Sequence, residues 1–398
     1  MNIELARKLD YYLGIFLCRI LSVFCRIKGL RVPAARKIPI HPKKVLFIEL
    51  CEMGSIILGY PAFIELKKYY PKVDIYFLTF HENIEAVLCS GVISERNIIG
   101  IRNKSIVVLL FDLWRSIRKL RRIGVDTVID MNFFFRVSAV LSYLSNASIR
   151  VGFYQKSHKG LYRGNMQTHK VLYDPGKHIK NNYISLVNAL KSDKINLHFH
   201  NHEQSEISNA TRIDTADIEA MRDRLRIFAP GLDLSYKLVL INLGEVDRIR
   251  LRKWPMRNYN KLIAMLLEHE KIFIVMVGKG HPGCEQLIRH ARCMDLIDKT
   301  NIRDMLSLCN LARVLVSHDC GMIHIASLTD IFICALFGPE TPKLYAPISE
   351  NMKIFYKELS CSPCLSAYNH KTFSCVNNNC LSEIKPEEVY ACLIEQIF

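Results

Sequence analysis

The stretch Val314-Leu-Val-Ser-His-Asp-Cys-Gly-Met-Ile-His-Ile-Ala-Ser-Leu328 joins a short apolar run, a polar turn and a helical pattern. The apolar run ends at Ser317, the turn contains Asp319 and Gly321, and the helix begins directly after it. A buried strand that passes at once into a helix is typical of a doubly wound α/β fold. N–H groups at such a helix start have no partner within the helix, so a diphosphate can bind there. The alternative is an ordinary helix cap, with His324 as a core histidine.

The same alternation of β-rich runs and helical patterns occurs on both sides of a polar region at 157–235. A chain of 398 residues also exceeds what one hydrophobic core usually serves. We therefore predict an α/β protein with two Rossmann-like, doubly wound domains that face a cleft. The expected parts are an amphipathic segment at 1–40, an acceptor domain at 41–205, a linker at 206–235 and a donor domain at 236–398. The predicted strands are 45–50, 74–79, 97–102, 127–131, 238–243, 271–278, 296–300, 314–317 and 331–337, with a basic helix at about 109–122.

Composition narrows the classes of partner. Half of the residues are hydrophobic and 23% are charged, which is typical of a folded globular protein. The formal net charge of +16 fits a phosphorylated substrate or an anionic membrane surface. No long Lys/Arg run and no aromatic-basic motif is present, so we expect no nucleic-acid partner. Most of the 14 cysteines stand alone in apolar stretches, which predicts free thiols and a cytoplasmic location.

The segment from Tyr11 to Cys25 is the most apolar part of the N-terminal region. It is shorter than the roughly 20 apolar residues of a membrane span and is interrupted by Arg19. As a helix it would have basic residues on one side and apolar residues on the rest. Two interpretations remain open: a helix in the interface of the membrane, or a terminal helix docked on the protein's own core.

Three further stretches are candidates for a ligand site. Arg248, Arg250, Arg252 and Lys253 lie close to the end of a predicted strand, where they fit a phosphate clamp or a solvated basic loop. In the loop 336–342, Glu340 or Thr341 could hydrogen-bond a sugar or ribose hydroxyl. The G-x-G-x-x-G at 278–283 contains Pro282 and does not open its Rossmann unit, so we interpret it as a strand-to-helix turn.

Four cysteines gather near the C-terminus with the spacing C-x2-C-x10-C-x4-C. This spacing could supply thiolates for a structural zinc, although the second pair lacks the x2 knuckle of a zinc ribbon. Free or paired thiols are the alternative. The four are Cys361, Cys364, Cys375 and Cys380.

Taken in order, these segments resemble glycosyltransferase family nine, the ADP-heptose:lipopolysaccharide heptosyltransferases. The resemblance covers about 45–398 and is sharper in the second half. A Met at 322 stands where the family usually has Pro. The matching features are Lys253-Trp-Pro255, the turn at Gly278 with Glu285 beyond it, Thr300, Ser317 to Ala326, Phe337-Gly-Pro-Glu-Thr-Pro342, and the closing Cys361-Ser-Pro-Cys364, Cys380 and Val389.

The resemblance implies a GT-B architecture with the nucleotide-sugar donor on the C-terminal domain. It also implies inversion at the anomeric carbon without a metal ion or other cofactor. Asp319, Cys320, Gly321 and His324 would surround the donor diphosphate. Arg252 or Lys253 would neutralise the charge of the leaving group. Glu285 and Thr300 fall where the family contacts the nucleoside and its ribose.

The N-terminal half departs from the family at the residue expected to be the catalytic base. Family members carry Gly-Asp in the loop after the first strand, whereas here Ser55 stands at the position of the Asp. A hydroxyl without a base beside it cannot deprotonate an acceptor. We take Glu52 as the candidate base. Two alternatives remain open: another carboxylate such as Glu49 or Asp130 acts instead, or transfer activity has been lost.

The acceptor side is implied only by the resemblance of Val128-Ile-Asp-Met131 and Arg136 to the family's first half. Asp130, Arg136 and Ser55 would line it. Arg163, His169 and His178 could contact acceptor phosphates, with solvated surface positions as the alternative for each.

The expected function is an inverting transfer of a sugar, with heptose as a candidate, from a nucleotide-diphosphate sugar to a lipopolysaccharide-type or other glycan acceptor. The enzyme would work in the cytoplasm, with peripheral attachment to the inner face of the cytoplasmic membrane as a further expectation. Two alternatives come from other classes: a nucleotide-sugar epimerase or hydrolase of the same fold, and a catalytically silent nucleotide- or glycan-binding protein.

Overall fold

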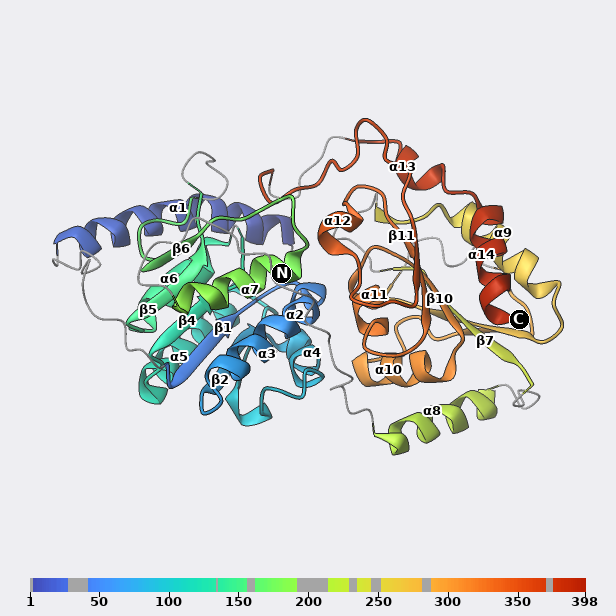
Figure 1. The fold of residues 1–398 in the computed structure, drawn as a ribbon, viewed down its shortest axis with the longest axis horizontal. Helices are drawn as coiled ribbons and strands as arrows, with labels where there is room; N and C mark the ends of the chain where they lie inside the picture. The colour runs from blue at the N-terminus through green and yellow to red at the C-terminus, as the bar shows by residue number, and fades with distance from the viewer. Residues whose placement is uncertain are drawn as a thin grey trace. The chain divides into compact units, whose positions relative to one another are not determined.

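The computed structural model describes residues 3–27, 42–133, 135–155, 162–191, 214–228, 235–244, 252–280, 288–369 and 375–398, with the side chains of 3–9 and 25–27 excepted. The chain forms two compact units (Figure 1). Unit 1 comprises Met1–Ser208 and Ala367–His370, and unit 2 comprises Asn209–Ser366 and Lys371–Phe398. Each unit is described by itself below.

Unit 1 is built on a parallel sheet, which has six strands in the described residues, in the order β3-β2-β1-β4-β5-β6. The four strands predicted in this half of the chain are confirmed, and each of their ends lies within two residues of the predicted position. The last two strands were not predicted, because polar and charged residues such as Arg150 and His169 interrupt their apolar pattern. The strands are β1 (Lys44–Ile48), β2 (Asp74–Phe80), β3 (Ile98–Ile101), β4 (Thr127–Asp130), β5 (Ile149–Phe153) and β6 (His169–Val171).

Helices cover both faces of this sheet (Figure 1). In a parallel sheet with right-handed crossovers, the connecting helices lie on one face for as long as the strand order runs in one direction. Here the direction reverses after β3, because the chain returns past β1 to form β4. Accordingly, α2, α3 and α7 pack together, while α6 contacts both α5 and α1. The helices are α1 (Ile3–Ile27), α2 (Met53–Leu58), α3 (Tyr60–Tyr69), α4 (Ile84–Leu88), α5 (Ile106–Ile123), α6 (Arg136–Leu144) and α7 (Ile179–Asn188), with 3-10 turns η1 (His81–Asn83), η2 (Glu95–Asn97) and η4 (Ala189–Lys191).

Helix α1 is held on unit 1 by a narrow stripe of small and polar residues. The Asp10 carboxylate accepts hydrogen bonds from the backbone N–H groups of Arg136 and Val137, both at 2.9 Å, and so caps the start of α6. Ser22 Oγ accepts from the backbone N–H of Asn165 at 2.9 Å. Gly14 lies so close to α6 that a Cβ atom there would be 2.7 Å from Arg136 Cβ. Helix α1 therefore docks on the rest of unit 1, which was one of the two interpretations of its sequence.

Unit 2 is also built on a parallel sheet, whose described strands follow the order β12-β11-β10-β7-β8-β9. The prediction of a strand at 296–300 is wrong. The strand ends at Asp295, whose carboxylate accepts from the N–H of Ile297, and the chain then turns through Asp298 with a φ of 59°. The strands are β7 (Lys237–Asn242), β8 (Ile272–Val277), β9 (Cys293–Asp295), β10 (Val314–His318), β11 (Phe332–Leu336) and β12 (Met352–Phe355).

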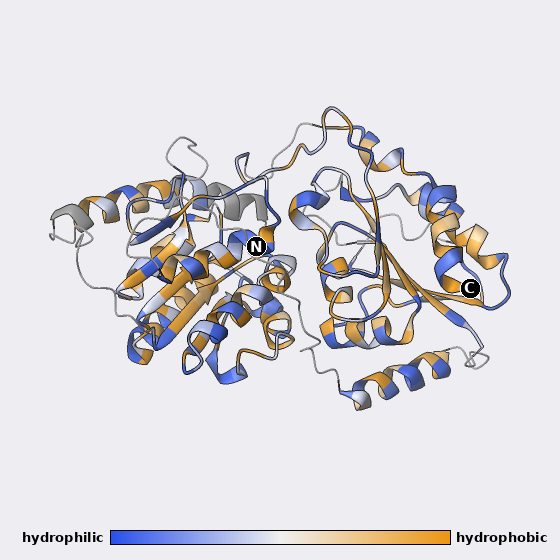
Figure 2. Ribbon diagram, in the orientation of Figure 1, coloured by the Kyte–Doolittle hydropathy of each residue, from blue (hydrophilic) through white to orange (hydrophobic). Residues whose placement is uncertain are grey.

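The core of unit 2 is formed by the apolar strands and the helices packed on them (Figure 2). Trp254 is buried there, and its indole N–H donates to the carbonyl of Ile384 at 3.0 Å. This bond ties the loop after β7 to the C-terminal segment. The helices are α8 (Thr215–Phe228), α9 (Met256–Leu267), α10 (Ile302–Leu311), α11 (Gly321–Ala326), α12 (Pro342–Tyr345), α13 (Asn379–Ser382) and α14 (Pro386–Ile397).

The predicted fold class is confirmed: each unit is a doubly wound, Rossmann-like α/β unit with a parallel sheet. The residues described include no helix that is both long enough and apolar enough to cross a membrane.

The close approach of α1 to α6 yields a first prediction. In Gly14→Leu the new side chain must displace Arg136 or the helix, so we expect the free energy of unfolding to fall by about 1–3 kcal/mol in urea titrations. The matched control is Leu17→Ala on the exposed side of α1, which should change it by no more than about 0.5 kcal/mol. Equal effects of the two changes would show that α1 is not docked through Gly14.

Candidate functional site

The carboxyl ends of β7 and β10 lie side by side in unit 2, because these strands are parallel neighbours with Asn242 opposite Ser317. Strand order reverses between them, which is where doubly wound sheets bind ligands. Asn242 is buried, and its Nδ2 donates to Ser317 Oγ at 2.9 Å and to Cys320 Sγ at 3.1 Å. Sequence reasoning did not single out Asn242, since an isolated Asn at a strand end carries no local signal.

An ion-pair cluster joins the loop after β7 to the ends of β10 and β11. Arg252 Nη2 donates to Asp319 Oδ2 at 2.6 Å and lies 3.7 Å from Glu340 Oε1. The Arg252 side chain is 22% exposed, whereas Asp319 is 6% exposed and Glu340 is fully buried. The two carboxylates thus fix one guanidinium from the protein side and leave part of it accessible. The structure therefore brings together three residues that were singled out in separate stretches.

The other predicted donor residues occupy the same edge of the sheet or the loops beside it. Cys320 and Gly321 form the start of α11, and His324 is buried within that helix. Thr300 lies directly before α10, whose N-cap is Asn301. The Lys253 carbonyl accepts from Asn378 Nδ2 at 2.7 Å. Glu285, Arg248 and Arg250 lie outside the described residues.

The loops flanking this cluster have defined backbone roles. Thr341 caps α12, since its hydroxyl accepts from the N–H of Lys343 at 3.3 Å. At Gly278 the chain turns with a φ of 133°, and a Cβ atom there would be 2.8 Å from the carbonyl oxygen of Gly244. Glycine is required for this close approach of two loops.

In unit 1 the corresponding switch point lies between β1 and β4, and the loop after β1 carries two glutamates. Glu52 is half-buried, and its Oε2 accepts from Ser55 Oγ at 2.9 Å. Glu49 is 4% exposed and accepts from the N–H groups of Cys51 and Glu52 at 3.2 and 3.3 Å. Burial, together with the charge of Glu52, raises the pKa of Glu49 to about 8. One carboxyl of this pair is therefore protonated near neutral pH.

Asp130, at the end of β4, is fully buried and forms an ion pair with Arg163. Arg163 also donates to the carbonyl of Asn132 at 2.6 Å and to Ser138 Oγ at 2.7 Å. The alternative that Arg163 is a solvated surface residue is therefore wrong. Asp130 Oδ1 accepts from the N–H and the Nδ2 of Asn132 at 3.1 and 3.2 Å, so both carboxylate oxygens of Asp130 have a partner within the fold.

Each of the remaining acceptor-side residues has a structural partner of its own. Arg136 is 1% exposed, and its Nη1 lies 3.4 Å from Asp10 Oδ2 beneath α1. His178 caps α7, its Nδ1 accepting from the N–H of Lys180 at 3.2 Å. His169 Nδ1 shares a hydrogen bond with Thr168 Oγ1 at 2.8 Å, and burial lowers the pKa of this imidazole. Each of these side chains thus already has a structural contact.

The C-terminal cysteines are free thiols. Cys361 and Cys375 are exposed, whereas Cys380 is buried and its pKa is raised by that burial to about 11. Across the described ranges, which include all four of these cysteines, no three His, Cys, Asp or Glu side chains are arranged to hold a metal ion. The charges of Cys361, Cys364 and Cys375 nevertheless raise the pKa of Cys380, so the four thiols lie near one another and a structural zinc at this spacing stays a prediction.

Comparison with known proteins identifies the family. The family model described as glycosyltransferase family 9 (heptosyltransferase) matches residues 113–373, which is more than half of the chain. The chain belongs to glycosyltransferase family 9. The resemblance noted in the sequence is thus confirmed, and the matched range contains the Arg252 cluster.

Curated relatives are matched over part of their length. Lipooligosaccharide heptosyltransferase 2 of Campylobacter jejuni is 23% identical over 145 residues, which cover 35% of this chain and 45% of the relative. The Haemophilus influenzae protein of the same name is 30% identical over 111 residues, or 26% of this chain and 32% of the relative. The chain thus matches less than half of the length of these relatives.

Two solved structures have the same fold. The Escherichia coli ADP-heptose lps heptosyltransferase II superimposes with a TM-score of 0.65 at 16% identity, covering 89% of this chain and 98% of that one. The family 9 glycosyl transferase from Veillonella parvula gives a TM-score of 0.68 at 19% identity, covering 92% and 99%. The likeness extends over both units of this chain.

The raised pKa of Glu49 predicts how stability depends on pH. From the ordinary value of 4.5 up to about 8, the folded protein retains a proton that the unfolded chain has lost. The free energy of unfolding therefore falls as pH rises through this window and levels off above it. Glu49→Gln should remove that fall, so the variant should gain on the order of 3 kcal/mol over the wild type between pH 5 and pH 8.

Urea titrations at a series of pH values measure this effect. Glu95→Gln is the matched control, since Glu95 is exposed in η2 of the same unit, and its pH profile should follow that of the wild type. A Glu49→Gln profile parallel to the wild type would show that the carboxyl of Glu49 titrates normally.

Proposed function

We propose that this family 9 protein is an inverting glycosyltransferase that moves a sugar from a nucleotide-diphosphate sugar to a lipopolysaccharide-type glycan acceptor. The observation that carries the proposal is the partly exposed Arg252 guanidinium, held by Asp319 and Glu340 at the switch point of unit 2. This is where a ligand of a doubly wound unit binds, and a planar guanidinium matches the geometry of phosphate oxygens.

On this proposal Arg252 binds the donor diphosphate, and Lys253 adds a second positive charge to the same loop. Departure of the nucleoside diphosphate leaves negative charge on its terminal phosphate, which a preorganised cation stabilises. The carboxylate of Asp319 would repel phosphate if it touched the diphosphate directly. We therefore assign Asp319 and Glu340 as positioning residues that keep the Arg252 guanidinium in place. No metal ion is needed in this scheme, because the leaving-group charge is compensated by the two cations.

Glu52 is proposed as the general base. It accepts the proton of the acceptor hydroxyl while the hydroxyl oxygen forms a bond to the anomeric carbon, and the bond from that carbon to the diphosphate oxygen breaks on the opposite face. Burial raises the pKa of Glu49 to about 8, which makes Glu49 the weaker candidate, and the half-buried Glu52 is the more accessible carboxylate of the pair. Ser55 would orient Glu52 through its 2.9 Å hydrogen bond.

The names of similar proteins suggest the substrates. One solved structure with this fold is the Escherichia coli heptosyltransferase WaaC with ADP, with a TM-score of 0.62. ADP is therefore the nucleotide we expect unit 2 to bind, and ADP-heptose is the first donor to assay. The acceptor would be a lipid-linked core glycan made in the cytoplasm. We propose that the protein works there, at the inner face of the cytoplasmic membrane.

Calorimetric titration with ADP, UDP, GDP and CDP tests the donor site. We expect one diphosphate, ADP, to bind selectively, and Arg252→Ala to weaken its binding about 10- to 100-fold through loss of a charge-assisted contact. Lys271→Ala is the control of equal charge, since Lys271 is exposed at the amino end of β8, on the opposite edge of the sheet. If no diphosphate binds the wild type, or if both variants weaken it equally, the donor site is wrongly placed.

Turnover with ADP-heptose and a core-glycan acceptor tests the base. Glu52→Gln should lower kcat by roughly 100- to 10,000-fold while leaving ADP affinity unchanged, because the general base acts only in the chemical step. Glu95→Gln should keep the wild-type rate. If Glu49→Gln abolishes turnover and Glu52→Gln does not, the base is Glu49. A wild type that binds ADP but transfers no sugar would instead be a nucleotide-binding protein.

A further inference from the structure

Helix α5 presents large apolar side chains to solvent while it buries polar ones. Asp112 and Ser116 are 5% and 3% exposed, and Asp112 is bound by the Arg102 guanidinium at 2.8 Å. On the outer side of the first turns, by contrast, the side chains are at least half exposed: Val107 77%, Leu110 60%, Phe111 53% and Trp114 51%. The solvent side of a surface helix normally carries polar side chains, so this outer face of α5 is suited to an apolar environment.

Helix α1 has the same arrangement. Its docking stripe is Gly14, Cys18 and Ser22, whereas the residues that it leaves exposed are mostly large and apolar. Small residues bring a helix close to its neighbour, but they bury little apolar area. Outward-facing residues of α1 include Tyr12 at 70%, Leu13 at 56%, Phe16 at 61%, Val23 at 52% and Phe24 at 50% exposure.

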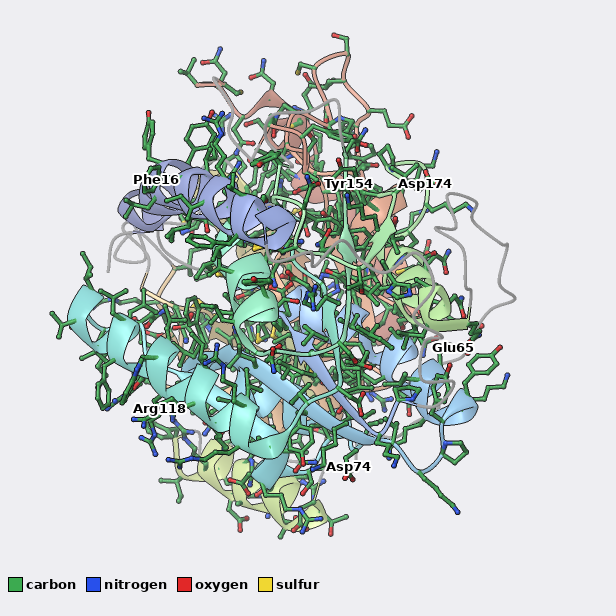
Figure 3. All side chains as sticks on the ribbon, turned by 90° about the vertical axis from the view of Figure 1, so that its left-hand side faces the viewer. Phe16, Glu65, Asp74, Arg118, Tyr154 and Asp174 are labelled. Atoms are coloured by element: carbon green, nitrogen blue, oxygen red, sulfur yellow. The ribbon has the colours of Figure 1, made fainter. Side chains whose placement is uncertain are left out.

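Both helices belong to one layer of unit 1. Helix α6 contacts α1 on one side and α5 on the other, and Arg121 of α5 donates to the carbonyl of Leu144 at the end of α6 at 2.8 Å. Figure 3 shows α1 and α5 on the same side of the unit, with Phe16 and Arg118 labelled on them. We call this outer surface, made by the exposed residues of α1 and α5, the α1–α5 face.

The exposed charges on the α5 part of this face are all positive. Residues 102–122 contain seven basic residues and a single acid, Asp112, which is buried in its ion pair with Arg102. The second half of α5 exposes Arg115, Arg118, Lys119, Arg121 and Arg122, directly after its apolar turns. The Arg118 guanidinium lies 4.4 Å from the centre of the Trp114 ring. An aromatic and aliphatic surface bordered by cations matches the chemistry of a bilayer with anionic headgroups.

We propose that the α1–α5 face binds the surface of an anionic lipid bilayer, with the apolar side chains of both helices inserted among the lipids and the basic residues of α5 in contact with headgroup phosphates. A bilayer is favoured over a second copy of this chain, because two such faces would bring like charges together. The inference goes beyond the proposed sugar transfer, and vesicle binding needs neither donor nor acceptor, so either can fail without the other.

The two tryptophans of the chain provide a direct measurement. Trp114 is 51% exposed on the α1–α5 face, whereas Trp254 is 2% exposed in the core of unit 2. The full-length protein is titrated with phosphatidylcholine vesicles that contain phosphatidylglycerol, and with phosphatidylcholine vesicles alone. We expect a blue shift of the emission and flotation with the anionic vesicles only. Trp114→Phe should still float with them but lose the shift.

Variants separate the contributions of charge and of apolar area. Arg118→Gln with Arg122→Gln should weaken vesicle binding roughly 30-fold, about fivefold for each basic residue near an anionic surface. Phe111→Ser with Trp114→Ser should weaken it at least as much. Ile227→Ser with Phe228→Ser is the matched control, because these residues of α8 in unit 2 are 77% and 66% exposed, and it should bind as the wild type does.

The result that would overturn the proposal is a wild type that stays unbound by anionic vesicles at low salt, or a control variant that loses as much affinity as the α5 variants. Analytical ultracentrifugation adds a second decisive outcome. If the wild type self-associates and the Phe111 and Trp114 double variant is monomeric, the α1–α5 face is an interface between copies of this chain. Thermal melts that agree between variants and wild type exclude misfolding as the cause, since all four substituted α5 residues are exposed.

Discussion

The reversal of strand order within each parallel sheet is the constraint on which the rest of this structure depends. Right-handed crossovers carry the chain outward from β1 in one direction and then back past it to β4, and the same happens between β7 and β10. Each reversal leaves two neighbouring strand ends from which loops diverge. The loop after β1 carries Glu49 and Glu52, and the ends of β7 and β10 are joined by Asn242 and Ser317. Both candidate sites therefore arise from topology before any particular side chain is considered.

The charged groups at these sites fall into two classes: one pair is fully compensated within the fold, whereas the other groups can still respond to a ligand or to pH. Asp130 and Arg163 are both inaccessible and compensate each other, which avoids the cost of an isolated buried ion. Arg252 is paired with Asp319 but remains partly exposed, so it keeps the capacity to meet a further anion. Within the described residues, Glu49 accepts hydrogen bonds from the backbone N–H groups of Cys51 and Glu52, and its burial is reflected instead in a raised pKa. The first pair is thus structural, whereas the other two groups remain responsive to a ligand or to pH.

The outer helices of unit 1 carry apolar side chains on their solvent side as well as on the side that faces the core. The core side of α5 has Leu120 buried and Leu113 and Ile117 packed against the cluster around β1 and β4, as an amphipathic helix requires. The solvent side adds a second apolar stripe that the fold itself does not need. Helix α1 similarly uses Gly14, Cys18 and Ser22 to dock, packs Leu21 beside Cys18, and leaves most of its other bulky residues exposed. Burial inside this unit therefore accounts for only part of the apolar content of either helix.

Local pattern determined the elements whose apolar runs are continuous. Strands β1, β2, β4, β7 and β10 and the helix α5 are evident from their sequences, because strands buried on both faces need uninterrupted apolar residues. The family was also predicted from short motifs such as Phe337-Gly-Pro-Glu-Thr-Pro342, and the match of the family model to residues 113–373 confirms it. Strands β5, β6 and β12 escaped notice because they are short or carry charged residues such as Arg150 and Lys353.

Only the tertiary structure decided how charged residues far apart in the chain are paired. Arg252 meets Asp319 across 67 positions, Arg163 meets Asp130 across 33, and Arg136 meets Asp10 across 126. The sequence by itself determined which of these residues carry charge and which strand ends they follow. It could not show that Arg163 is buried, that Arg136 is covered by α1, or that α5 faces outward with its aromatic residues. Those properties depend on contacts between residues that are far apart in the chain, and such contacts produce no periodic pattern in the amino-acid sequence.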